Sequence, residues 1–189
     1  MNRLSPASIG RLLQPSRPDP EVMNEIATLI EPHIPALRRF AWALLRDEEG
    51  SDDLVQDCLE RAIGRWHLRR RDGNVRAWLF AILHNLFVSG LRARRRRGEQ
   101  VAFEDDDLPS TESDPEERLM LRDVLAGLDA LPAEQRSVLL LVGVEELEYQ
   151  EVARILDVPV GTVMSRLSRG RERLRQYLGA GQVGLRRVK

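Results

Sequence analysis

The last third of the chain combines an apolar helical stripe with hydroxyl and guanidinium groups on the opposite face. Val163, Leu167, Leu174 and Leu178 recur at spacings of four and seven, which places them on one side of a helix. The other side carries short polar and basic residues, namely Ser165, Arg166, Ser168, Arg169, Arg171 and Arg173. Hydroxyl and guanidinium groups can hydrogen-bond to base edges, and guanidinium groups also bind phosphates. This face therefore predicts contact with the major groove of duplex DNA.

A second helical pattern precedes this one and is separated from it by a tight turn. Residues 149–156 offer Val152, Ile155 and Leu156 inward, residues 157–159 form the turn, and Thr162 can help to cap the following helix. An Arg-rich amphipathic helix taken alone is more often an ordinary surface helix. The turn, the preceding helix with small Ala153 near the crossing and the one-sided basic charge together favour a DNA-binding helix-turn-helix over residues 149–177.

A different mixture of cations and aromatic rings lies between residues 66 and 80. It consists of Trp66, His67, Arg69, Arg70, Arg71, Arg76, Trp78 and Phe80. Arg supplies charge for phosphates and aromatic rings stack on unpaired bases, so this set suits melted or single-stranded DNA better than an intact duplex. Trp78 is flanked by Ala77 and Leu79 and is expected in the core instead.

An acidic helix face precedes this cluster. Residues 51–63 predict a helix with Ser51 as its N-cap and with Asp52, Asp53, Gln56, Asp57 and Glu60 on its polar side. Asp52 and Asp53 are also residues that the helix dipole favours in a first turn. An acidic face within an otherwise basic region indicates a protein partner rather than DNA.

Two features of the next helical segment each have two interpretations. Asn85 is a poor helix former among Ile82, Leu83, Leu86 and Phe87, so its amide either has a functional task or satisfies a buried hydrogen bond. The run Arg92, Arg94, Arg95, Arg96 and Arg97 suits the dipole at a helix end, and it can equally lie against phosphates.

The composition predicts a globular, all-α protein. The 189 residues are 42% hydrophobic and only 5% aromatic, which suits packed helices better than a barrel or sandwich. The single cysteine, Cys58, excludes an internal disulfide, and without a signal peptide or membrane-spanning run the expected location is the cytoplasm. His33, His67 and His84 are far apart and no Gly-rich phosphate loop is present, so we expect no catalytic residue, metal or cofactor.

Charge is segregated along the chain although the formal net charge is -1. Residues 61–97 hold eleven Arg and one acid, residues 98–117 nine acids and no base, and residues 161–189 eight bases and one acid. Helical periodicity on both sides of the acidic stretch predicts two small helical domains. The predicted order is a flexible tail (1–21), a first domain (22–98), an acidic flexible linker (99–115), a second domain with the helix-turn-helix (116–180) and a basic tail (181–189). The linker is either a solvated spacer or a mask for the basic faces.

Taken in order, three stretches resemble the extracytoplasmic-function (ECF) group of the sigma-70 family, the bacterial factors that direct RNA polymerase to promoters. They are DDLVQDCLERAIGRW at residues 52–66, VRAWLFAILHNLFVSGLR at 75–92, and LPAEQRSVLLL at 131–141 followed by YQEVARILDVPVGTVMSRLSRGRERLR at 149–175. The resemblance spans residues 26–178.

The resemblance implies three contact surfaces. A face including Asp52, Asp53, Gln56, Asp57 and Glu60 would bind the clamp helices of the polymerase β′ subunit. The melted −10 element would be held by Trp66, His67, Arg69, Arg70, Arg71, Arg76, Asn85 and Arg92. The second domain would dock on the β flap and contact the duplex −35 element through Thr162, Met164, Ser165, Arg166, Ser168, Arg169, Arg171 and Arg173. Met164 stands where the family often has Lys or Arg. The resemblance also implies an anti-sigma partner acting in a stress or environmental response.

Two other classes of function remain open alternatives at this stage. An ordinary helix-turn-helix regulator that binds duplex DNA without polymerase could carry a similar C-terminal module. Such a regulator would need a sensory or phospho-acceptor domain with parallel strands, whereas residues 22–97 indicate helices with a basic and aromatic surface. An enzyme is disfavoured because its catalytic or metal-binding residues are not apparent.

Overall fold

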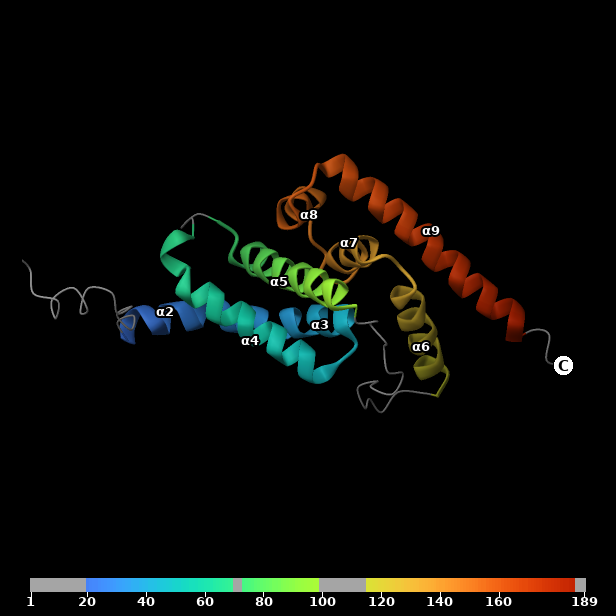
Figure 1. Cartoon of the computed structure of the whole chain (residues 1–189), viewed down its shortest axis with the longest axis horizontal. Helices are drawn as coiled ribbons and strands as arrows, with labels where there is room; N and C mark the ends of the chain where they lie inside the picture. Colours follow the sequence, from blue (N-terminus) through green and yellow to red (C-terminus); the bar gives the residue numbers. More distant parts are fainter. Residues whose placement is uncertain (1–19, 70–72, 99–114, 186–189) are drawn as a thin grey trace, which may run out of the picture. The chain divides into compact units, whose positions relative to one another are not determined.

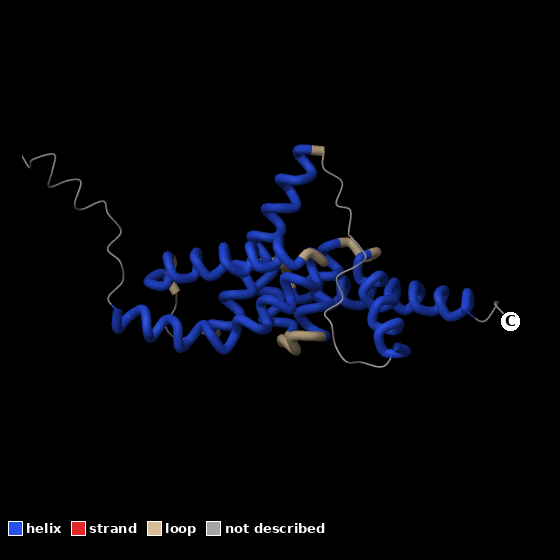
Figure 2. Tube along the Cα trace, turned by 90° about the horizontal axis from the view of Figure 1, so that it is seen from below, coloured by secondary structure: helices blue, strands red, loops and turns tan. Residues whose placement is uncertain are grey.

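The computed structural model describes residues 20–69, 73–98 and 115–185, and all of its regular elements are helices (Figure 2). This confirms the predicted all-α class. The elements in Figure 1 are α2 (Pro20–Ile30), η1 (Glu31–His33), α3 (Ile34–Leu45), α4 (Glu48–Gly64), η2 (Trp66–Leu68), α5 (Val75–Arg97), α6 (Pro115–Asp129), α7 (Ala133–Gly143), α8 (Tyr149–Leu156) and α9 (Val160–Leu185). Most of the predicted linker, at residues 99–114, lies outside the described residues, as do 1–19 and 186–189.

The chain divides into two compact units, Met1–Pro32 and His33–Lys189. In the first unit, α2 carries its buried residues Ile26 and Ile30 four positions apart, on one face. Sequence periodicity predicts no break at residues 31–33, but a short 3-10 helix lies there. Pro35 explains the break. It lies in the first turn of α3, where a backbone N–H has no partner within the helix, so proline is tolerated there but not in the interior of a continuous helix.

In the second unit, α3, α4 and α5 pack around a shared apolar core (Figure 1). Phe40 of α3 and Phe80 of α5 meet edge to face with ring centroids 5.3 Å apart. The α4 helix begins earlier than predicted: Asp47 is its N-cap and accepts a hydrogen bond from the Gly50 N–H (3.0 Å). Ser51 is therefore an internal, buried residue rather than a cap, and Glu48 and Glu49 occupy the first turn.

The helix-turn-helix is formed by α8 and α9, whose starts agree with prediction. Glu148 and Glu151 form a capping box at the start of α8, and Asp157 ends the helix in the left-handed region with φ 52°. Gly170 lets α9 approach α7 closely, because a Cβ there would lie 2.9 Å from Leu139 Cδ1. Gly127 similarly allows α6 to pack on α9, against Leu174 and Tyr177.

The helices on either side of the acidic stretch also pack against each other, with α3 on α7 and α5 on α8. All of these helices belong to the unit His33–Lys189. The two predicted domains are thus held in direct contact, which the sequence patterns do not indicate. Within the described residues, no helix is both long and apolar enough to cross a membrane.

Candidate nucleic-acid interface

The predicted DNA-contact residues of α9 are placed mainly on one exposed face. Met164 is 53% exposed, and Ser165, Ser168, Arg169, Arg171 and Arg173 are exposed with it, whereas Thr162 is half-buried. The opposite face is closed, since Val163, Leu167 and Gly170 are buried. The amphipathic pattern of the helix is therefore confirmed, and its polar face is accessible to a duplex.

Hydrogen bonds within α9 order part of this face. Arg169 donates from Nε to the Ser165 carbonyl (3.1 Å) and from Nη2 to Ser165 Oγ (3.2 Å), while Ser165 Oγ donates to the Thr162 carbonyl (3.0 Å). Arg173 reaches back to α7, where Nη1 donates to Gln135 Oε1 (3.4 Å). The Arg169 guanidinium is therefore held close to Ser165 before any DNA binds, which limits the side-chain entropy lost on binding.

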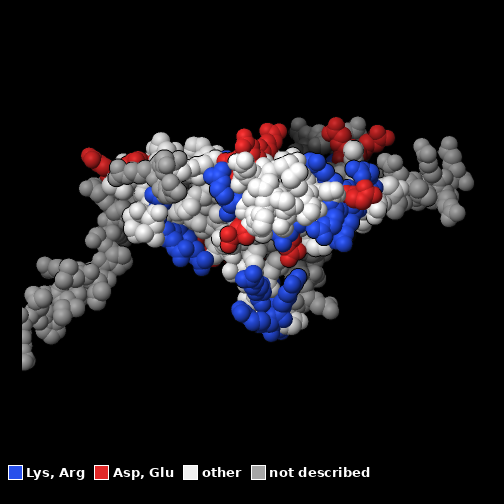
Figure 3. Space-filling model, turned by 90° about the horizontal axis from the view of Figure 1, so that it is seen from above, with Lys and Arg blue, Asp and Glu red and all other residues white. Residues whose placement is uncertain are grey.

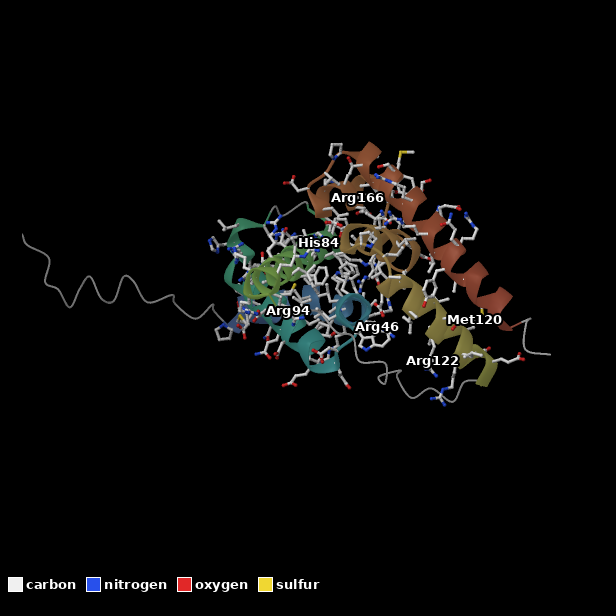
Figure 4. The ribbon with its side chains drawn as sticks, turned by 45° about the vertical axis from the view of Figure 1, so that its right-hand side comes forward. Arg46, His84, Arg94, Met120, Arg122 and Arg166 are labelled. Atoms are coloured by element: carbon white, nitrogen blue, oxygen red, sulfur yellow. The ribbon has the colours of Figure 1, made fainter. Side chains whose placement is uncertain are left out.

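Arg166 lies apart from this exposed face. It is half-buried and lines a cavity of about 280 Å³ between α5, α7 and α9, together with His84, Arg92, Arg95 and Glu134. His84 on α5 and Arg166 on α9 are labelled in Figure 4. The pKa of the His84 imidazole is lowered from 6.5 to about 4, mainly by burial and to a lesser extent by Arg166, while Glu134 partly opposes the shift. Arg166 is thus partly shielded from solvent at the junction of α5, α7 and α9.

The aromatic and basic residues before α5 and in its first turns form one packed cluster. Trp66 and Trp78 meet edge to face with centroids 5.9 Å apart, and the Arg69 guanidinium lies 4.6 Å from the centre of the Trp66 ring. Arg69 Nη1 also donates to the Gly73 carbonyl (3.2 Å). His67 is exposed, and the predictions for Arg70 and Arg71 fall outside the described residues. Trp78 is half-buried against Trp66, so it belongs to this cluster rather than to the buried core predicted for it.

Arg76 does not extend this cluster but binds the C-terminal half. Its Nη2 donates to Glu145 Oε2 (2.8 Å) and to the Glu145 carbonyl (2.9 Å), and its guanidinium lies 5.4 Å from the centre of the Phe80 ring. Arg39 of α3 binds the same carboxylate, with Nε and Nη2 each donating to one oxygen at 2.9 Å. Glu145 lies between α7 and α8 and is only 2% exposed. Its role has no sequence signal, because acidic residues are common in interhelical turns.

Asn85 and Arg92 are both exposed on α5. A buried hydrogen bond of the Asn85 amide, one of the two interpretations of this residue, is therefore excluded. The helix ends in Arg94, Arg95, Arg96 and Arg97, followed by Gly98 in the left-handed region with φ 73°. In the view of Figure 3, Arg side chains gather into patches, with Asp and Glu side chains between them. Arg95 and Arg96 are exposed at this end of α5.

The five residues of the predicted acidic face, Asp52, Asp53, Gln56, Asp57 and Glu60, are all exposed on α4. Asp52 Oδ1 lies 3.4 Å from Arg38 Nε, and Gln56 Nε2 donates to Glu60 Oε1 (3.1 Å). Asp53 and Asp57 also line an open cavity of about 240 Å³ with apolar groups of α4 and α5, among them Leu54 and Phe87. An acidic edge beside an apolar hollow is suited to a basic, amphipathic protein segment.

Cys58 lies on the buried side of α4. Its Sγ donates to the Leu79 carbonyl (3.5 Å), and burial raises the pKa of the thiol to about 12. Within the described ranges, no three His, Cys, Asp or Glu side chains are grouped as metal ligands. Cys58 therefore serves packing between α4 and α5.

Comparison with known proteins matches both halves of the chain. Residues 30–84 match the family model of the sigma2 domain of PhyR, and residues 121–174 match sigma-70 region 4. The ECF RNA polymerase sigma factor EcfG of Rhodopseudomonas palustris is 37% identical over 145 residues, covering 77% of this chain and 80% of EcfG. The RNA polymerase sigma-E factor of Streptomyces coelicolor is 34% identical over 156 residues, covering 80% of this chain and 84% of that factor.

A solved structure is similar over nearly the same region. The sigma factor RpoE from Bartonella quintana, in complex with the anti-sigma factor NepR, has 32% sequence identity and a TM-score of 0.71, covering 84% of this chain and 97% of RpoE. Since sigma-factor relatives account for both halves of the chain, an ordinary helix-turn-helix regulator is disfavoured. The chain belongs to the ECF RNA polymerase sigma factors of the sigma-70 family.

Proposed function

We propose that this sigma factor binds core RNA polymerase through the acidic face of α4 and holds promoter DNA at two separate surfaces. Residues 22–98 form the domain that binds the β′ clamp helices and the melted −10 element. Residues 116–180 form the domain that docks on the β flap and binds the duplex −35 element. The observation that carries this proposal is the exposure of three chemically distinct surfaces, one acidic, one aromatic and basic, and one of hydroxyl and guanidinium groups.

Polymerase binding is assigned to α4 because this helix presents exposed acidic residues beside a surface hollow. Asp53, Asp57 and Glu60 are exposed on consecutive turns, and the hollow beside Asp53 and Asp57 is lined mainly by apolar groups, with Arg94 as its one cation. Charged groups at the rim steer a basic partner into place, and apolar groups supply the buried area. The β′ clamp helices that the family resemblance indicates would occupy this surface.

The cluster of Trp66, Trp78 and Arg69 is assigned to the melted −10 element. Partly exposed indole rings accept unpaired bases by stacking, and neighbouring guanidinium groups bind the backbone. The exposed His67, Asn85 and Arg92 are included in this surface. An intact duplex, whose bases already stack on one another, offers no face for these rings.

Binding at both promoter elements requires the two halves to separate. Arg76 is bound by Glu145 and Arg166 is half-buried beside His84, so one of the predicted phosphate contacts is paired within the molecule and a second is partly enclosed. The free protein is therefore a closed form, and docking of the two halves on different parts of polymerase supplies the free energy that opens it. In this proposal, contacts between the two halves, rather than the acidic linker, keep Arg76 and Arg166 away from DNA in the free protein.

An anti-sigma protein is the proposed inhibitor. RpoE from Bartonella quintana is bound to the anti-sigma factor NepR in its solved structure, and CnrH, 26% identical with a TM-score of 0.64, is bound to the cytosolic domain of CnrY. By analogy, a partner that covers the acidic face of α4 would exclude polymerase. Control by such a partner would tie this factor to a stress or environmental signal.

Reconstituted transcription tests the proposed function. Core polymerase with this protein is expected to initiate from a defined set of promoters on host genomic fragments, whereas core alone initiates at none of them. Transcript starts should share two upstream elements at a constant spacing. If the same starts arise without the protein, the proposed function is wrong.

A further inference from the structure

We propose that Met164 contacts the 5-methyl group of a thymine in the −35 element and makes this position selective for thymine. The inference rests on the proposed function, because it assumes that α9 lies in the major groove. Met164 is the fifth residue of α9 and 53% of it is exposed. In helix-turn-helix proteins the N-terminal part of the second helix is the part that reaches base edges.

Met164 shares its helix face with residues suited to DNA. Met164, Ser168, Arg171 and Arg175 are spaced by four, three and four residues, and all are exposed. Together with Tyr149, Leu167 and Glu172 they line an open hollow of about 380 Å³. The apolar thioether therefore stands in line with a hydroxyl and two guanidinium groups, not on the side that packs against α7.

The surroundings of Met164 favour DNA over a protein partner. Arg169, Arg171, Arg173 and Arg175 follow it on α9, and Glu172 is the one acidic residue among positions 161–185. Glu172 pairs with Arg175, so Arg169, Arg171 and Arg173 remain as an excess of positive charge that attracts phosphates and that an apolar protein groove would not balance. Tyr149, 37% exposed at the start of α8, provides a second partly apolar side chain beside the hollow.

The chemistry of a methionine selects one feature of the groove. Base edges present hydrogen-bond donors and acceptors, and the thymine 5-methyl is the single apolar group among them. Methionine has no donor and only a weak thioether acceptor, so it gains little from guanine or adenine edges. Its flexible side chain can follow a methyl group closely. Burying one methyl group against it is expected to change affinity by about fourfold.

Deoxyuridine substitution removes the methyl group and nothing else, which makes the test specific. Holoenzyme assembled from core polymerase and this protein first selects its −35 element from randomised duplexes. Each thymine of the selected element is then replaced by deoxyuridine, one position at a time, and holoenzyme affinity is measured. We expect a loss of about fourfold at one position and almost none elsewhere.

Variants assign that loss to one side chain. In Met164→Ala holoenzyme, the thymine and deoxyuridine duplexes should bind equally well at the sensitive position. Met120→Ala is the matched control, because Met120 on α6 (Figure 4) is 70% exposed but lies outside the helix-turn-helix, and it should retain the fourfold difference. Both variants replace exposed side chains, and thermal melts verify that they fold.

Three results would overturn the proposal. The first is that no thymine position responds to loss of its methyl group, and the second is that the response persists in Met164→Ala. Either result refutes the role of Met164. If Arg171→Ala weakens −35 binding by the same holoenzyme, α9 still contacts the −35 element and the proposed function stands. The third is that holoenzyme selects no −35 element, which refutes the proposed function together with the role of Met164.

Discussion

Arg76 on α5 and Glu145 between α7 and α8 form an ion pair, with Nη2 2.8 Å from Oε2. The Glu145 side chain is 1% exposed and also binds Arg39 of α3. Two guanidinium groups thus share one buried carboxylate. Of these, Arg39 lies more than a hundred positions before Glu145 in the sequence. The pair holds a residue predicted to contact the −10 element against the half of the chain predicted to contact the −35 element.

Neutralising Glu145 should weaken the closed form. Glu145→Gln leaves Arg39 and Arg76 without a counter-charge in a partly buried site, and the free energy of unfolding should fall by about 2 kcal/mol. Urea denaturation followed by circular dichroism measures this change. Glu146→Gln is the control, since Glu146 is the exposed neighbour with the same charge. Equal midpoints for the two variants would show that the Glu145 contacts contribute nothing.

Acidification should destabilise the protein through His84. The unfolded chain protonates this imidazole near its ordinary pKa of 6.5, whereas in the folded chain the pKa is about 4. The unfolded state therefore binds more protons between these values, so stability is full above pH 6.5 and is lost as the pH falls toward 4. Between about pH 7 and pH 5, His84→Gln should show a smaller drop in Tm than the unchanged protein. An identical drop would mean that His84 is not the group responsible.

Reversing one charge on α4 should impair polymerase binding. Asp57→Arg places a cation on the surface proposed for the β′ clamp helices, and core affinity should fall by about tenfold or more. Glu25→Arg makes a similar change at an exposed position of α2, outside the proposed contact surfaces, and should retain core affinity. Fluorescence titration of labelled protein with core measures both. Unchanged affinity of Asp57→Arg would show that polymerase binds elsewhere.

Removing the Arg169 guanidinium should weaken promoter binding. Arg169→Ala also frees Ser165 from two hydrogen bonds, and holoenzyme should lose about 1 to 3 kcal/mol at the −35 element and become less selective at one base pair. Binding to single-base variants of the selected duplex provides the measurement. Arg122→Ala, an exposed residue of α6 (Figure 4), controls for the loss of one positive charge. A uniform loss across all variants would instead identify Arg169 as a phosphate contact.

Local sequence patterns predict the helices of this protein well. The 149–156 helix is predicted at its observed bounds, and the apolar stripe containing Val163 and Leu167 is buried as expected. The sequence also predicts correctly which residues of α4 are exposed, although the N-cap of this helix is Asp47 rather than Ser51. Periodicity and capping act within one or two turns of chain, so they can be seen in the sequence.

Contacts between distant helices are not predictable in this way. Arg76 and Arg166 have the composition and spacing of DNA-contact residues, yet one binds Glu145 and the other lines the cavity beside His84. An Arg suited to a phosphate is equally suited to a buried carboxylate, and only the tertiary arrangement decides between them. Glu145 itself carries no local signal. The same limit applies to Trp78, whose edge contact with Trp66 depends on the turn between α4 and α5.

The affinity of the promoter −35 duplex for this protein, with and without core polymerase, tests the account most directly. A closed sigma factor should bind the duplex weakly alone and at least about tenfold more tightly once assembled with core. Fluorescence anisotropy with the selected −35 duplex, at one fixed salt concentration, gives both values. Equal, tight, sequence-specific binding in the absence of core would contradict the account.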